Sequence, residues 1–165
     1  MVDATSDART SRPLRLGMVG GGRGAFIGAV HRLCARMDGR YELVAGALSS
    51  APERAKESGA DLGLVADRVY TSYSEMAAAE AKRPDGIDAV SIVTPNDSHH
   101  AIARAFLDRG IDVICDKPMT TTVEDALDLV QAVRKSGLVF GLTHNYTAYP
   151  LVRQAREMAF LLSIG

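Results

Sequence analysis

A run of glycines separates a short apolar segment from a helical pattern, and its chemistry is that of a phosphate cradle. It reads Gly20-Gly21-Gly22-Arg23-Gly24-Ala25-Phe26-Ile27-Gly28. Glycines permit a tight turn and let backbone N–H groups approach a pyrophosphate, which the next helix N-terminus also attracts. The run satisfies G-x-G-x-x-A, but we prefer Gly20, Gly22 and Gly28 with a three-residue insertion, because Gly28 suits close packing of the helix. These glycines and Arg23 are candidate cofactor contacts; a merely flexible strand-to-helix loop is the plainer alternative.

Two serines stand where a dinucleotide-binding fold usually carries an acidic residue, at the end of the second apolar run. That acidic side chain accepts from the ribose hydroxyls and selects NAD. Ser49 and Ser50 are found there instead, and Arg54 follows one turn into the next predicted helix. Serine hydroxyls and an arginine can bind a 2′-phosphate, so both NAD and NADP stay open. Arg54 as a solvated helix charge is the alternative interpretation.

A polar loop, Thr94-Pro95-Asn96-Asp97-Ser98-His99-His100, follows the apolar run 87–93. Ligands of open α/β sheets bind at the carboxyl ends of the strands, so short polar side chains there can reach a ribose or a nicotinamide. The simpler interpretation is a capped turn in which Asn96 to Ser98 begin a helix and both histidines lie at the surface. Adjacent histidines rarely converge on one metal ion, so we expect no metal site.

Cys115-Asp116-Lys117-Pro118 ends the next predicted strand, at the same edge. A lysine ammonium beside a reacting carbinol or carbonyl can stabilise developing negative charge or take part in proton transfer. Most strand-end lysines are only solvated, and the shared edge with the proposed cofactor is what singles out Lys117.

Several other catalytic patterns are missing from the sequence. It contains no G-K-[ST] phosphate loop, no C-x-x-C, no H-E-x-x-H and no G-x-S-x-G. The Tyr-x-x-x-Lys pair of short-chain dehydrogenases is also missing, which disfavours that class of reductase.

The composition is that of one globular domain. The chain has 165 residues, of which 47% are hydrophobic and 24% charged, with a formal net charge of -1. This charge balance argues against nucleic acid or an anionic membrane as partner, and no apolar stretch is long enough for a transmembrane helix. Two cysteines far apart suit reduced thiols, so we expect a cytoplasmic protein.

Strand and helix patterns alternate along the chain. We predict strands at 14–19, 41–48, 87–93, 111–115 and 139–142, and a brief one at Val69-Tyr70. Predicted helices cover 25–37, 73–82 and 98–109, with others beginning at Pro52, after Thr121 and at Pro150. Capping boxes are expected at Ser72 with Glu75 and at Thr121 with Glu124. Such alternation predicts a doubly wound, mostly parallel α/β Rossmann sheet with helices on both faces. Residues 1–12 are expected to be a disordered tail and 13–150 the cofactor-binding domain.

Taken together, three motifs resemble the Gfo/Idh/MocA oxidoreductases, named for glucose-fructose oxidoreductase, inositol dehydrogenase and rhizopine catabolism. They are the glycine turn ending in G-x-x-H at His31, the T-P-N-x-x-H loop from Thr94 to His99, and the run Gly110 to Pro118. The resemblance covers about residues 14 to 158. It implies NAD(P)-dependent hydride transfer on a small sugar, cyclitol or related polyol.

The resemblance also implies roles for individual residues. Lys117 matches the catalytic lysine of E-K-P, and Asp116 replaces the usual glutamate with a shorter carboxylate. Matches to cofactor positions are Thr94, Pro95, Asn96, His99, Asn145 and Lys117 itself. Family members carry a second, substrate-binding domain and associate through its sheet, so a homo-oligomer is expected only of a full-length form.

No substrate-domain pattern follows Pro150, and 151–165 resemble the start of a linker helix. We therefore expect a fragment, a truncated product or a shortened gene. Three hypotheses remain: a cofactor domain of an oxidoreductase, a non-catalytic dinucleotide-binding module, and a structural protein of flavodoxin-like topology. Nucleotide binding separates the third from the others, and turnover of a polyol separates the first two.

Overall fold

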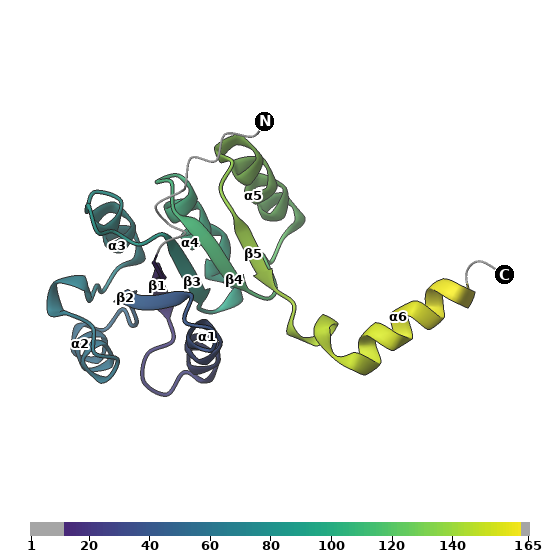
Figure 1. Cartoon of the computed structure of the whole chain (residues 1–165). Coiled ribbons are helices and arrows are strands. Elements are labelled where there is room, and N and C mark those ends of the chain that lie inside the picture. The colour runs from purple at the N-terminus through teal and green to yellow at the C-terminus, as the bar shows by residue number, and fades with distance from the viewer. Residues whose placement is uncertain (1–11, 163–165) are drawn as a thin grey trace.

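Five parallel strands form a single sheet in the computed structural model, which describes residues 12–162 (Figure 1). The strands are β1 Leu14–Gly20, β2 Tyr41–Ala47, β3 Ala89–Val93, β4 Asp112–Asp116 and β5 Phe140–Thr143, in the order β2-β1-β3-β4-β5. The order reverses between β1 and β3, where Gly20 pairs with Val93 at the carboxyl ends. Ligands of doubly wound sheets bind at such a reversal. The predicted fold class is confirmed.

Helices cover the two faces of the sheet unequally (Figure 1). They are α1 Phe26–Arg36, α2 Pro52–Asp61, α3 Tyr73–Glu80, α4 His99–Leu107, α5 Val123–Ser136 and α6 Pro150–Leu162, with short 3-10 turns at 66–68, 96–98 and 145–148. Helices α1 and α2 lie on one face, α3, α4 and α5 lie on the other, and α6 leads away from the sheet. The face that carries α1 is therefore open beside β4 and β5.

The larger part of the core lies on the α4 side of the sheet. Every residue of β3 is buried, and Phe106 of α4 is fully enclosed with Val90 and Val113. Alternate residues of each strand face opposite sides, so Ser91 and Asp116 belong to the α1 side. The smaller cluster on that side centres on Met18 and Leu48.

Local structure at two predicted positions differs from the sequence expectation. The brief strand predicted at Val69-Tyr70 is reduced to a single parallel bridge between Val69 and Gly46. Ser72 caps α3 as predicted, but its hydroxyl accepts from the backbone N–H of Ser74, and Glu75 is not its partner.

The N-cap of α5 lies one residue later than expected. Thr122 accepts from the backbone N–H of Asp125, and the helix begins at Val123. Thr121 therefore lies outside the helix and was the wrong choice of cap. The end of α5 is as predicted, because Gly137 has a left-handed φ of 70°.

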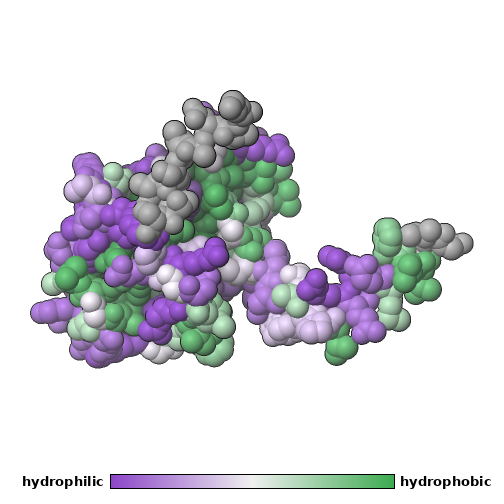
Figure 2. All heavy atoms as spheres, viewed as in Figure 1, coloured by the Kyte–Doolittle hydropathy of each residue, from purple (hydrophilic) through white to green (hydrophobic). Residues whose placement is uncertain are grey.

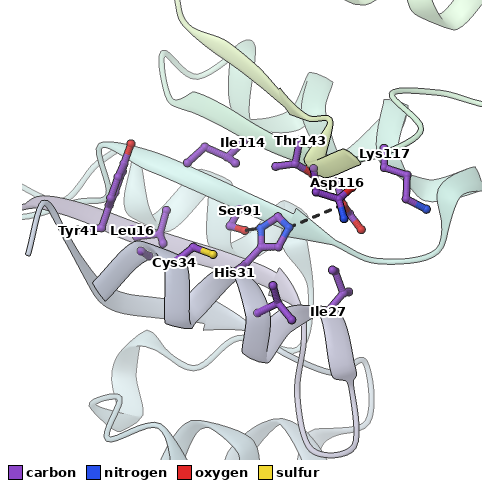
Figure 3. Close-up of a pocket in the computed structure, with 13 residues that line it drawn as sticks. Leu16, Ile27, His31, Cys34, Tyr41, Ser91, Ile114, Asp116, Lys117 and Thr143 are labelled. Atoms are coloured by element: carbon purple, nitrogen blue, oxygen red, sulfur yellow. Dashed lines mark hydrogen bonds and ion pairs between the residues drawn. The ribbon is translucent and has the colours of Figure 1, made fainter. Parts of the chain in front are cut away.

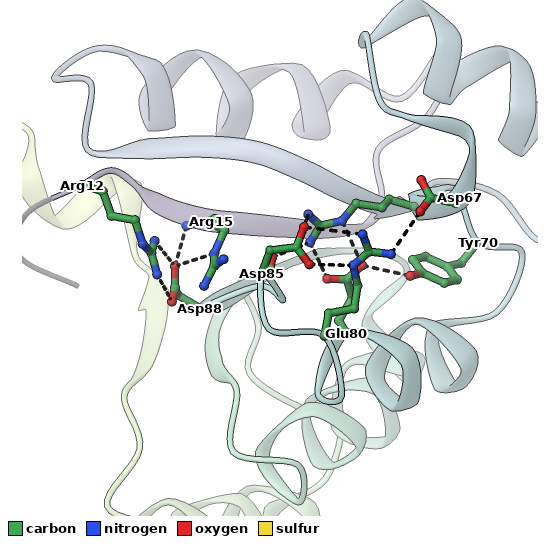
Figure 4. Close-up of polar contacts among 9 residues, drawn as sticks. Arg12, Arg15, Asp67, Tyr70, Glu80, Asp85 and Asp88 are labelled. Carbon is green, nitrogen blue, oxygen red and sulfur yellow. Dashed lines mark hydrogen bonds and ion pairs between the residues drawn. The ribbon is translucent and has the colours of Figure 1, made fainter. Parts of the chain in front are cut away.

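Two clusters of ion pairs connect segments that are distant from each other in the sequence (Figure 4). Arg68 and Glu80 are buried, Glu80 accepts from Arg68 Nε at 3.1 Å, and Tyr70 Oη donates to the same carboxylate at 2.9 Å. Arg12 donates to both carboxylate oxygens of Asp88, at 2.7 and 2.9 Å. Arg12, which we placed in the tail, thus lies against the domain, and the rest of the expected tail falls outside the described residues.

Helix α6 exposes an apolar surface. Its exposed apolar side chains include Leu151, Val152, Met158, Phe160, Leu161 and Leu162, and the space-filling view shows hydrophobic side chains mainly toward the outer end of this arm, among hydrophilic ones (Figure 2). Nevertheless, none of the helices within residues 12–162 has the length and apolar character needed to cross a membrane.

Candidate functional site

The glycine turn brings α1 unusually close to the end of β1. Gly21 has a φ of +73°, which favours glycine, and a Cβ on Gly28 would overlap Gly21 Cα. The packing role predicted for Gly28 is therefore observed, with Gly21 as its partner. At Gly22, a Cβ would lie 2.6 Å from Leu48 O, so this position also admits no side chain. The turn has the compact backbone that a phosphate needs for close approach.

The first turn of α1 is free of side-chain caps. Its N-cap residue, Ala25, provides no side-chain hydrogen bond, and the first turn carries no acidic residue. The first backbone N–H groups of a helix lack intrahelical partners and attract anions. The site therefore fits the pyrophosphate of a dinucleotide.

Two arginines beside the turn are held by the protein. Arg23 donates to the carboxylates of Glu57, at 2.6 Å, and Asp61, and the hydrogen bond with Asp61 raises the pKa of Arg23 most. Arg32, which the sequence analysis did not identify, donates to Gly21 O at 2.7 Å. Both arginines line a cavity of about 270 Å³ next to the turn. No sequence motif points to Arg32, because its partner is a backbone carbonyl.

The predicted ribose-binding residues lie at the start of α2. Ser49 Oγ accepts from the backbone N–H of Ala51 at 3.1 Å, which leaves its own O–H able to donate. Ser50 and Arg54 are exposed. They stay candidate contacts for a ribose or its 2′-phosphate.

His99 joins the two loops at the carboxyl edge. The ring is fully buried, with Nε2 2.9 Å from Thr94 O and Nδ1 2.8 Å from Pro118 O. The interpretation of His99 as a surface residue is wrong, because the turn after Lys117 covers it. Its ring nitrogens face the protein, whereas Pro95 and Asn96 are exposed at the edge. Any effect of His99 on a cofactor therefore passes through the two loops.

Asp116 and Lys117 differ in their surroundings. Asp116 points beneath the sheet edge, where its Oδ1 accepts from Thr143 Oγ1 at 2.8 Å. Lys117 is exposed, and its side chain extends away from Asp116 (Figure 3). Both predicted catalytic residues line the same cavity, and Lys117 is the more exposed of the two.

His31 is a site residue to which the sequence analysis gave no role. Its Nδ1 lies 2.9 Å from Ser91 Oγ, and its Nε2 lies 3.8 Å from Asp116 Oδ1 (Figure 3). Burial lowers the pKa of His31, while the Asp116 carboxylate opposes that shift. The G-x-x-H ending of the glycine turn was the available signal, but the partners of His31 come from strands far along the chain.

A cavity of about 300 Å³ opens between α1 and the strands β3 to β5. Asp116, Lys117 and Asn145 line its polar end, and apolar side chains such as Leu16, Ile27 and Ile114 line the rest. Asn145 is exposed at the start of a 3-10 turn after β5. Within the described residues, no group of three or more potential metal ligands gathers here or elsewhere.

The sequence of the chain matches known oxidoreductases. Residues 14–144 match the family model described as "Oxidoreductase family, NAD-binding Rossmann fold". The chain is 42% identical over 149 residues to the uncharacterized oxidoreductase YfiI of Bacillus subtilis, covering 90% of this chain and 38% of that protein.

Solved structures agree in fold. An oxidoreductase from Sinorhizobium meliloti is 60% identical with a TM-score of 0.82, over 93% of this chain and 43% of that one. An inositol dehydrogenase homolog from Azotobacter vinelandii, complexed with NADH and myo-inositol, is 43% identical with a TM-score of 0.86, over 95% and 41%. The chain thus spans about two fifths of the length of these relatives. Over that span it belongs to the Gfo/Idh/MocA oxidoreductase family and contains the family's NAD-binding Rossmann domain.

Proposed function

We propose that the chain holds its dinucleotide across the carboxyl edge of the sheet, with the pyrophosphate on Gly20, Gly22 and the first turn of α1. The uncapped N-terminus of α1 carries this proposal, because its first N–H groups lack intrahelical partners and attract an anion. Arg23 lies beside the turn and can exchange its carboxylate partners for a phosphate, since it is half exposed. The nicotinamide end would then lie toward Thr94, Pro95, Asn96 and Asn145.

Lys117 is the residue that we assign to the reaction. A bound nicotinamide would accept hydride from a carbinol carbon or, in the reverse direction, give hydride to the corresponding carbonyl carbon. The ammonium of Lys117 stabilises negative charge on the substrate oxygen, and its Nζ gives or takes the hydroxyl proton. We give Asp116 an indirect role below the carboxyl edge of the sheet, because its Oδ1 already accepts a hydrogen bond from Thr143.

We infer that the substrate is a sugar, a cyclitol or a related polyol. The names of relatives support this class: a UDP-N-acetylglucosamine 3-dehydrogenase of Acidithiobacillus ferrooxidans is 28% identical, and a D-xylose 1-dehydrogenase (NADP(+)) of Hypocrea jecorina is 32% identical. In this proposal, residues 151–165 begin the connection to a substrate-binding domain, and any homo-oligomer belongs to the form that carries that domain. Two free cysteines, one exposed and one buried, support a cytoplasmic location.

The cofactor preference is open to a direct measurement. Ser49, Ser50 and Arg54 favour NADP(H), whereas the Azotobacter vinelandii homolog was solved with NADH. Calorimetric titration of the chain with all four oxidised and reduced cofactors gives the preference. If Arg54 binds a 2′-phosphate, Arg54→Gln weakens NADPH binding and leaves NADH binding unchanged. Equal loss for both cofactors would contradict that role.

Two further variants test the assignment of the site. Gly22→Val places a side chain against Leu48 O and should abolish cofactor binding, whereas Gly141→Ala, where a Cβ would lie 3.9 Å from Val113 O and the φ is not positive, should not. Lys117→Met should lose polyol turnover in any form that carries a substrate domain while its cofactor affinity falls only severalfold, with Lys82→Met as the exposed control. Failure to bind any of the four cofactors would refute the proposed function. Turnover of a polyol by the chain alone would exclude the non-catalytic alternative.

A further inference from the structure

Four polar side chains meet directly beneath the carboxyl edge, and we call them the His31 cluster: His31, Ser91, Asp116 and Thr143. Each comes from a different element, namely α1, β3, β4 and β5 (Figure 3). Ser91 is 1% exposed, and the side chains of His31 and Asp116 are 10% and 17% exposed. The cluster therefore links the helix that follows the glycine turn to the strand that ends beside Lys117.

The distances within the His31 cluster define two kinds of contact. His31 Nδ1 and Ser91 Oγ are 2.9 Å apart, and Thr143 Oγ1 donates to Asp116 Oδ1 at 2.8 Å. The third separation, from His31 Nε2 to Asp116 Oδ1, is 3.8 Å and is too long for a hydrogen bond. With an uncharged ring, the Asp116 carboxylate is thus held chiefly by Thr143.

The charge on His31 decides which neighbour holds Asp116. An imidazolium 3.8 Å from the carboxylate is an ion pair with little water around it, and it attracts the oxygen that Thr143 now holds. Burial lowers the pKa of His31, so the uncharged ring is the form present at neutral pH. The remaining titratable side chains around this cavity are Cys34 of α1, Tyr41 of β2 and Lys117 itself.

We propose that His31 is a positioning residue for Lys117. While the His31 ring is uncharged, the Asp116 carboxylate stays hydrogen-bonded to Thr143 and Lys117 keeps its place at the cavity. Asp116 is the last residue of β4 and the covalent neighbour of Lys117, so a movement of Asp116 toward α1 is passed to the backbone that carries Lys117. Protonation of His31 draws Asp116 toward α1 and displaces Lys117 from the cavity between α1 and the strands β3 to β5. This inference rests on the proposed role of Lys117, but the coupling itself is a property of the folded chain.

Nuclear magnetic resonance of the unmodified chain tests the coupling without any cofactor. The ring nitrogens of the four histidines and the backbone amide of Lys117 are followed from pH 8 to pH 4.5. We expect the Lys117 amide to shift with the same midpoint as the His31 ring, below the ordinary histidine value. A Lys117 amide that ignores the His31 titration, or a ring that takes up no proton in this range, would overturn the proposal.

A matched pair of variants separates positioning from general stability. His31→Gln should make the Lys117 amide independent of pH, whereas His100→Gln should leave its titration intact. His100 is a suitable control because it is also partly buried against carboxylates, with Nε2 2.8 Å from Asp128 Oδ2 between α4 and α5. Equal behaviour of the two variants would refute the specific role of His31.

Cofactor binding gives a second readout. The NADH affinity of the chain should fall about three- to tenfold between pH 7.5 and pH 5.5, a change of about 0.7 to 1.4 kcal/mol. His31→Gln should remove this pH dependence and His100→Gln should keep it. If the amide coupling is present but NADH does not bind at any pH, the proposed function fails and the coupling stands. If NADH binds and neither measurement responds to His31, the positioning role fails and the cofactor site stands.

Discussion

Substitution of Glu80 by glutamine should destabilise the domain more than any conservative change at its surface. The Glu80 carboxylate is fully buried and binds Arg68, itself only 6% exposed, together with the hydroxyl of Tyr70 (Figure 4). In Glu80→Gln the amide group keeps the shape of the side chain but removes its charge, and its N–H groups face those of the guanidinium. Arg68 is then a buried cation that has lost its principal partner.

The size of the effect follows from the environment of Arg68. Breaking a buried ion pair by removing one partner costs about 3–5 kcal/mol. Asp85 lies 3.5 Å from Arg68 and is 54% exposed, so it compensates only part of the loss and we expect about 3 kcal/mol. Domains of this size unfold with about 5–15 kcal/mol in total. The variant should therefore lose a substantial share of its stability and remain folded at low denaturant concentration.

Urea denaturation followed by circular dichroism measures this loss. With a slope of about 1–3 kcal/mol per molar urea, the midpoint should fall by about 1–3 M. Glu75→Gln on the same helix is the control, because Glu75 is exposed and its midpoint should hardly move. A midpoint for Glu80→Gln equal to that of the control would show that Arg68 finds another partner, and the reasoning on the buried pair would be refuted.

Three other changes test separate parts of the fold. Gly28→Ala should cost about 1–3 kcal/mol in urea denaturation, because the new Cβ overlaps Gly21 Cα; an unchanged midpoint would show that α1 moves freely from the turn. Thr122→Ala should cost about 1 kcal/mol and Thr121→Ala almost nothing, and the reverse order would restore Thr121 as the cap. Burial and the hydrogen bond to Glu80 raise the pKa of Tyr70 to about 12, so tyrosinate absorbance should include a late component that Tyr70→Phe lacks. Because the folded pKa lies above the unfolded value of about 10, this stabilisation is complete below pH 10 and is lost as the pH rises through 12. Titration of all tyrosines near pH 10 would contradict this.

The sequence was sufficient for the sheet and for the loops at its carboxyl edge. Apolar runs ending in glycine or in short polar residues predicted the bounds of β1, β2 and β4 to within one residue and those of β3 to within two, because hydrophobic pattern and turn chemistry act over short distances. Lys117 and Thr94 could be placed at one edge for the same reason, since parallel strands end together. The sequence motifs therefore predicted the course of the backbone correctly at this edge of the sheet.

What the sequence could not provide is the set of contacts made by side chains across the fold. His99 looks like a surface residue beside His100, yet the turn at Pro118, 19 residues away in sequence, buries it. The contacts of His31 are with Ser91 and Asp116, 60 and 85 residues later in the chain, and no local sequence pattern predicts them. Burial of polar groups depends on tertiary packing, and a single sequence carries no record of it.

The position of His99 bears on how this domain can be re-engineered. The His99 ring lies within hydrogen-bond distance of the carbonyl oxygens of both Thr94 and Pro118, so α4 and β4 lie within a segment whose two ends meet at one side chain. A loop library that varies only the loop at Thr94 or only the loop at Pro118 would leave the other loop fixed against His99. Segments exchanged with a related domain should instead carry residues 94–118 as one unit, with crossover points placed inside β3 and α5. Recombinants cut between Thr94 and Pro118 are expected to fold less often than those cut outside them.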